Sequence, residues 1–127
     1  MGIVLDHTHI PSRDKDASAR QFATVFGLPY ESPQSSWQAA IRVNETYKVA
    51  FIDYTHPVES HHYAFRVDEE TFDACLSRVQ GAGIVYGSDP DDAKNGKTNT
   101  HNVGRGFYYL DLDGHLMELL TQPDPTV

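Results

Sequence analysis

The sequence predicts an α+β fold in which two βαβββ modules form a curved mixed sheet with helices packed outside. A strand, a helix and further strands follow one another twice along the chain. A similar exit follows each helix, GLPY at residues 27–30 and GIVY at residues 83–86. One helix covers such a sheet only in part, so the modules are expected to share one sheet. With 127 residues, 39% of them hydrophobic, the chain is expected to be a single domain (1–127) with modules over about residues 3–54 and 61–121.

The first module is expected to begin with a strand at residues 3–10. Alternation along this strand places His7 and His9 on the same face. Pro11 and the serine after it are expected to end the strand, because proline interrupts the hydrogen-bond ladder. The first module therefore presents two imidazoles side by side.

A helix is expected at residues 15–26. Asp14 suits its N-cap, because an aspartate side chain accepts a hydrogen bond from a free N–H of the first turn. Gly27 is expected to stop the helix. The rest of the module is expected to consist of a loop at residues 29–34, strands at 37–43 and 47–54, and a turn at 44–46 between them.

The second module repeats this order with a strand at residues 62–67 and a helix capped by Asp68. Gly81 and Gly83 are expected to end the helix before a short strand at residues 84–86. The apolar side chains of the helix recur at i, i+3, i+4 and i+7: Phe72, Cys75, Leu76 and Val79.

A loop rich in Gly, Asp and Asn follows at residues 88–104. Loops of this length are uncommon inside a compact domain and tend to be functional. We hypothesise that it is a lid with Gly96 and Gly104 as its hinges. A plain connector is the alternative.

The last segment, RGFYYLDLDGHLMELLTQ, has the form of a β-hairpin. A three-residue loop at 112–114 would be closed by Gly114 in the left-handed conformation. This register sets Tyr108 opposite Glu118, on the same face as several leucines. A carboxylate there is costly if it is buried and unpaired. Glu118 is therefore either a solvated or salt-bridged rim residue, or a metal ligand or catalytic acid/base facing a cavity.

The formal net charge of −8 argues against nucleic acid or an anionic membrane as a partner, because both favour a basic surface. A lone cysteine, Cys75, forms no intramolecular disulfide, and the N-terminal MGIVLDHTHI lacks the features of a signal peptide. No apolar run approaches the ~20 residues needed to span a bilayer. A cytoplasmic protein is expected.

His7, His62 and Glu118 lie on three different predicted strands. Two neutral imidazoles and a carboxylate suit a borderline divalent metal with open coordination positions. Spacing alone does not select these residues, because the sequence has no short HxH or HExxH box on one element. The rival candidates are His9, His61 and His115.

Three segments resemble the vicinal oxygen chelate superfamily: LDHTHIPSRD at 5–14, HYAFRVD at 62–68 and FYYLDLDGHLMELL at 107–120. The superfamily includes glyoxalase I, fosfomycin-resistance enzymes, extradiol dioxygenases and bleomycin-binding proteins. Its sites carry a His in the first strand of each module and a Glu in the final strand. The resemblance therefore implies that His7, His62 and Glu118 bind a divalent ion such as Zn, Fe, Mn, Ni or Co.

The same resemblance implies roles for neighbouring residues. His9, two residues beyond His7 on the same face, would line the cavity as an acid/base or substrate contact. Tyr108, beside Glu118, would orient the substrate or a ligand water. His61 is expected to point away from its neighbour His62, and His115, which follows the hairpin glycine, is expected to be a turn residue.

The subfamilies differ in other positions. Glyoxalase I-like enzymes have a second Glu in the first module, where counting along the strands puts Phe51, with Asp53 two residues on. Fosfomycin enzymes need a cluster of Lys, Ser and Arg that the loop at 88–104 supplies only in part. Extradiol dioxygenases usually have extra modules and a further catalytic His. Bleomycin-type binders need no metal, and the retention of all three ligands argues against membership of that class.

The resemblance thus implies a divalent-metal-dependent enzyme that chelates two adjacent oxygens of a small-molecule substrate, as a lyase, isomerase or dioxygenase. The alternative is a metal-free binding protein of the bleomycin-resistance type that sequesters a drug or metabolite. Two-module members commonly pair across a two-fold axis. The resemblance therefore implies a homodimer, with His7 from one chain and His62 and Glu118 from the other.

Overall fold

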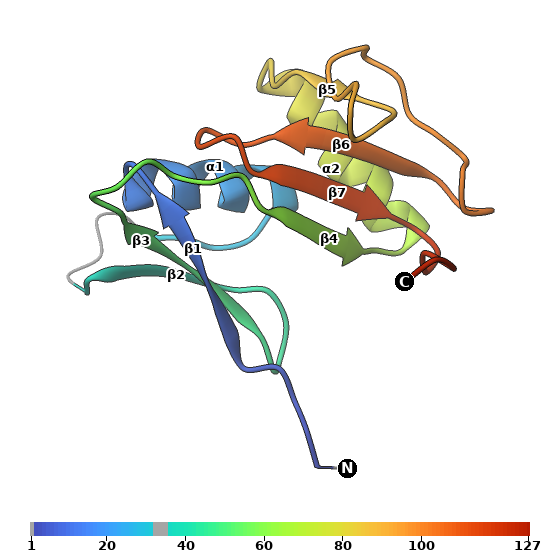
Figure 1. The fold of residues 1–127 in the computed structure, drawn as a ribbon. Helices are drawn as coiled ribbons and strands as arrows, with labels where there is room; N and C mark the ends of the chain where they lie inside the picture. The colour runs from blue at the N-terminus through green and yellow to red at the C-terminus, as the bar shows by residue number, and fades with distance from the viewer. Residues whose placement is uncertain (1, 32–35) are drawn as a thin grey trace. The chain divides into compact units, whose positions relative to one another are not determined.

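The structure, a computed structural model, describes residues 2–31 and 36–127. It divides the chain into two compact units, Met1–Val58 and Glu59–Val127. The predicted α+β class is confirmed, since each unit combines one helix with a small mixed sheet (Figure 1).

The first unit holds a three-stranded sheet in the order β1-β3-β2. Strand β1 pairs parallel with β3, and β2 pairs antiparallel with β3. The elements are β1 (His7–Ser12), α1 (Lys15–Phe26), β2 (Gln38–Arg42) and β3 (Lys48–Asp53). The predicted loop at residues 29–34 lies partly outside the described residues.

Strand β1 begins later and ends later than predicted. The prediction that Pro11 and Ser12 end the strand is wrong, because both pair with β3, opposite Ile52 and Asp53. Within the described sheet β1 is an edge strand, and an edge strand tolerates proline because only one of its sides carries a ladder.

Helix α1 has the predicted caps. The Asp14 side chain accepts a hydrogen bond from the Ala17 backbone N–H, and Gly27 takes the left-handed conformation with φ 66°. The apolar face of the helix packs on the sheet through Phe22, which contacts the Phe51 ring edge-on at 5.8 Å between centroids. Phe51 is fully buried there.

The second unit holds a four-stranded sheet in the order β4-β7-β6-β5. Strand β7 is therefore central, parallel to β4 on one side and antiparallel to β6 on the other. The elements are β4 (His62–Arg66), α2 (Glu69–Gly81), β5 (Tyr86–Gly87), β6 (Gly106–Leu110) and β7 (Leu116–Leu120).

Helix α2 covers one face of this sheet (Figure 1). Phe72 of the helix contacts Phe107 of β6 edge-on, and the Arg105 guanidinium lies 4.4 Å from the Phe72 ring centroid. Met117 and Leu119 are fully buried. Because side chains alternate along a strand, the residue between them, on the face away from α2, is Glu118.

Several hydrogen bonds tie down the loop at residues 88–104. The side chain of Asn95 accepts from the Ser88 N–H, and Asn99 and Gly106 exchange two backbone hydrogen bonds. Gly96 has φ 72°, whereas Gly104 packs so closely against Thr121 that an added Cβ would collide with its hydroxyl. Close packing therefore explains the glycine at position 104, and the lid stays a prediction.

Candidate functional site

Glu118 and His62 form a pair on adjacent strands of the second unit. In the β4–β7 ladder Ala64 lies opposite Glu118, which places His62 two residues earlier on the same face. The His62 Nε2 lies 2.8 Å from Glu118 Oε1. Glu118 is only 6% exposed and sits on a central strand, so it is not an edge residue. Its carboxylate is buried, and the imidazole of His62 compensates part of the burial cost.

Tyr108 is directly opposite Glu118 in the β6–β7 ladder, as the hairpin register predicted. Its ring centroid lies 6.2 Å from that of His62. Burial, with the charge of Glu118 and a hydrogen bond to it, raises the pKa of Tyr108 to about 12. The phenol therefore stays protonated at neutral pH and is a hydrogen-bond donor in this site.

The pair borders a cavity of about 460 Å³ on the face of the sheet away from α2. The C-terminal segment forms part of its wall. The residues that line it are His62, Ala64, Arg66, Glu118, Leu120, Pro123, Asp124 and Val127.

The first unit holds the other two predicted histidines. His7 is exposed and its Nδ1 lies 2.7 Å from Asp6 Oδ2, which leaves Nε2 to serve as a ligand atom. His9 Nε2 lies 3.0 Å from Gln38 Oε1, and the two imidazole centroids are 5.3 Å apart. The exposed ring of Trp37 contacts His9 edge-on.

The structure thus brings His62, Glu118 and Tyr108 together in one unit and His7 with His9 in the other. The complete triad of His7, His62 and Glu118 stays a prediction. The three side chains of this triad suit a divalent metal, because their donors are two imidazoles and a carboxylate. Two of these donors already converge on one point at the rim of a cavity.

The position equivalent to Glu118 in the first unit is Ala50, so the predicted match to Phe51 is wrong by one residue. Ala50 lies opposite His9 in the β1–β3 ladder, as Glu118 lies opposite Ala64. Phe51 points to the other face, into the core. Neither Ala50 nor Phe51 carries a carboxylate, so this position lacks the second acid of glyoxalase I-like sites.

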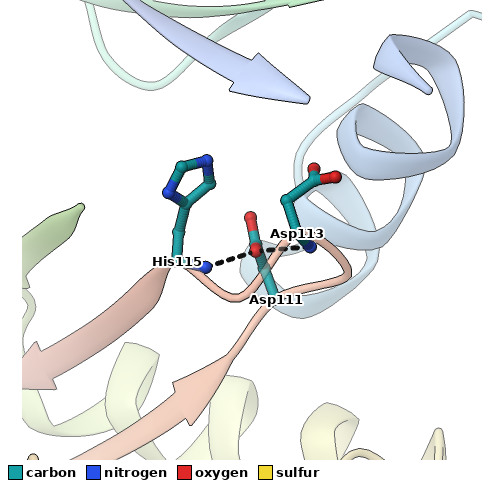
Figure 2. A group of neighbouring side chains, drawn as sticks. All are labelled: Asp111, Asp113 and His115. Atoms are coloured by element: carbon teal, nitrogen blue, oxygen red, sulfur yellow. Dashed lines mark hydrogen bonds between the residues drawn. The ribbon is translucent and has the colours of Figure 1, made fainter. Parts of the chain in front are cut away.

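A second cluster surrounds the hairpin turn, where ligand atoms of Asp111, Asp113 and His115 lie within 4.8 Å of one another (Figure 2). Asp111 Oδ1 accepts hydrogen bonds from the backbone N–H groups of both other residues, at 2.9 Å each. His115 is fully buried, and its Nδ1 accepts from the His61 N–H. These bonds stabilise the turn that closes at Gly114 with φ 83°, so His115 is a turn residue as predicted.

Sequence reasoning missed the partners that orient the histidines. Asp6 was visible as the immediate neighbour of His7, and a carboxylate bound to the second ring nitrogen is a common feature of ligand histidines. Gln38, the partner of His9, comes from β2, and no local signal connected the two.

Comparison with known proteins identifies the family, although no family model matches the sequence. The structure of oxidase ChaP-H2 is 35% identical over 98% of both chains with a TM-score of 0.90. Oxidase ChaP-H1 is also 35% identical, over 96% of this chain and 98% of that one, with a TM-score of 0.88. The fosfomycin resistance protein FosX of Mesorhizobium loti, at 22% identity and a TM-score of 0.69, shares the fold.

Among curated proteins, the glutathione transferase FosA of Serratia marcescens is 40% identical over 68 residues. The match takes in 52% of this chain and 41% of FosA, so it spans less than half of that relative. Together with the fold and the His–Glu pair, these likenesses show that the chain belongs to the vicinal oxygen chelate superfamily, as the sequence motifs indicated. Its relatives there are enzymes of the glyoxalase and dioxygenase type.

Neither helix in the described part of the chain has the length and apolar character needed to cross a membrane.

Proposed function

We propose that the protein is a divalent-metal-dependent enzyme that oxidises a small molecule with two adjacent oxygens, with molecular oxygen as the oxidant. The observation that carries the proposal is the 2.8 Å contact between His62 Nε2 and Glu118 Oε1 at the rim of the 460 Å³ cavity. A carboxylate that is 6% exposed on a central strand is costly unless it has a function or a strong partner.

In this proposal His62 and Glu118 hold the metal together with His7. A bound divalent cation would supply Lewis-acid stabilisation of negative charge on the substrate oxygens. The hydroxyl of Tyr108 is hydrogen-bonded to Glu118 in the free protein; in the proposed complex, where Glu118 binds the metal, it donates its hydrogen bond to substrate instead. His9, held by Gln38, accepts or returns a proton.

Oxidation is preferred to the lyase and isomerase reactions for two reasons. The relatives ChaP-H1 and ChaP-H2, whose chains this one covers almost completely, are both described as oxidases. The first unit has alanine at the place of the second acid that glyoxalase I-like isomerases use. A screen of catechols with oxygen uptake as the readout tests for oxidation. Isomerisation, and the addition of a thiol or water to an epoxide, consume no oxygen.

We also propose a cytoplasmic homodimer that completes the site with ligands from both chains. Each unit has a short sheet with an edge that another sheet can cover. The single cysteine, Cys75, is buried and free, which suits a reducing compartment. A monomeric mass in light scattering at micromolar concentration would contradict the dimer.

Metal analysis of protein purified without chelators tests the central claim. Wild type should hold about one equivalent of a divalent metal per chain, and His62→Ala and Glu118→Ala should hold much less. Glu59→Ala, which removes an exposed carboxylate of the same unit, is the matched control and should keep its metal. Equal, substoichiometric metal in wild type and both site variants would favour the metal-free binding protein instead.

A further inference from the structure

The side chain of an arginine, Arg66, lines the cavity beside His62 and Glu118, and the proposed metal site does not use it. Arg66 lies on β4, four residues beyond His62, and alternation places both on the same face of the sheet. It lies opposite Leu120 of β7, and the neighbouring wall residues are also apolar, with Ala64 and Val127 among them. Arg66 is exposed, so its guanidinium is solvated where no acid pairs with it.

Arg66 has no such partner in the described part of the chain, where its guanidinium makes no ion pair and no hydrogen bond. Other arginines are satisfied. The guanidinium of Arg42 donates to the backbone carbonyls of its own turn, and that of Arg105 pairs with Glu69 and Asp73.

Besides Glu118, the other acid that lines the cavity is engaged in its own turn. Asp124 accepts hydrogen bonds from the backbone N–H and the hydroxyl of Thr126, at 2.8 and 2.7 Å. Its carboxylate is thereby held in its own turn. The free donors of Arg66 therefore border the cavity and are available to a ligand.

We propose that Arg66 binds a carboxylate at one end of the substrate, while the other end reaches His62 and Glu118. A guanidinium offers parallel N–H donors that match the two oxygens of a carboxylate. Four strand residues separate the Cα atoms of His62 and Arg66 by about 13 Å, less the reach of the arginine side chain. The substrate class is thus an elongated acid with an apolar middle that lies over Ala64 and Leu120.

The charges around the cavity favour a carboxylate over a phosphonate. The lining has one arginine against two carboxylates, Glu118 and Asp124. A dianion would meet a single cation and two like charges, whereas a monoanion needs only the guanidinium. This inference rests on the proposed function only in taking the cavity as the substrate site.

The test uses 3-(3,4-dihydroxyphenyl)propanoate and its primary amide, which differ only in the charged group. Both are titrated into the full chain without oxygen, metal-free and zinc-loaded, while NMR follows the backbone amides and the Arg66 Nε–H. Wild type should bind the acid at least about tenfold more tightly than the amide, as expected for a hydrogen-bonded ion pair. Arg66→Gln should lose this preference, Arg66→Lys should keep part of it, and Arg42→Gln should keep all of it.

Equal binding of acid and amide by wild type overturns the inference. So does a preference that survives in Arg66→Gln, or an Arg66 Nε–H signal that does not move at tens of millimolar acid. Metal content is measured on the same samples. A wild type that binds metal but shows no preference for the acid refutes the role of Arg66 alone, whereas an Arg66-dependent preference in a wild type that binds no metal refutes only the proposed function.

Discussion

Replacement of Glu118 by alanine tests whether this residue is a metal ligand or a structural carboxylate. Removal of one partner of a buried ion pair usually costs several kcal/mol, because the other charge remains buried. Here the partner, His62, has a side chain that is 49% exposed, so water can replace Glu118 as its hydrogen-bond partner and no buried charge is left. The shortened side chain also opens onto the 460 Å³ cavity, so it leaves no sealed void.

The expected change in the free energy of unfolding of the metal-free protein is therefore small, within about 1 kcal/mol of wild type. The metal-loaded proteins should differ strongly. A metal present at a hundred times its dissociation constant stabilises the fold that binds it by about 2.7 kcal/mol. Wild type should gain that stabilisation, and Glu118→Ala should gain almost none.

Urea denaturation with zinc and with EDTA measures both quantities in one set of curves. Glu59→Ala is the matched control, and should gain stability from zinc as wild type does. Two results refute the reasoning. The first is an equal gain from zinc in Glu118→Ala and wild type, which would remove Glu118 from the metal site. The second is a loss above about 3 kcal/mol in EDTA, which would make the carboxylate structural.

Three further predictions concern Tyr108, Gly104 and Asp111. Tyr108→Phe removes one hydroxyl and should keep the metal while turnover falls about tenfold or more; unchanged turnover would make the phenol a packing residue. Gly104→Ala should destabilise the fold by about 1–3 kcal/mol in urea denaturation, because its Cβ would collide with Thr121, whereas Gly2→Ala, at a glycine with open space, should have no effect. Burial raises the pKa of Asp111 against the opposing effect of its bonds to His115 and Asp113, with Tyr109 also close, so the folded state holds this proton more tightly than the unfolded chain. Because of Asp111, the free energy of unfolding should therefore fall as the pH rises from about 4 through the folded pKa of this residue. Asp111→Asn should show a smaller fall. An identical pH dependence in the two proteins would contradict the prediction.

Features set by neighbouring residues could be predicted from the sequence. Asp14 and Gly27 bound α1 as expected, because a cap depends on residues within one turn of the helix. The pairing of Tyr108 with Glu118 was also predictable, since the short turn before Gly114 fixes the register of the hairpin.

Features set by distant pairing could not be predicted in the same way. Strands β1 and β3 are parallel and are joined through a helix and another strand, so no turn fixes their register. Counting along the sequence was therefore wrong by one residue, and it selected Phe51 in place of Ala50, which is also buried but lies on the opposite face of the strand. The hydrogen bonds that tie Asn95 and Asn99 to the ends of their loop are equally invisible in a stretch of polar residues.

The corrected register makes the two units comparable position by position. In the second unit a ladder position holds Glu118, with Tyr108 opposite it on the next strand, and in the first unit the same two positions hold Ala50 and Ala40. Both alanines line a cavity of about 210 Å³ beside His7. A metal bound by His7 must therefore take its carboxylate from outside this ladder. A site of two imidazoles and one carboxylate needs only one acid, so alanine at this position of the first unit is compatible with Glu118 as the single carboxylate ligand of the proposed triad.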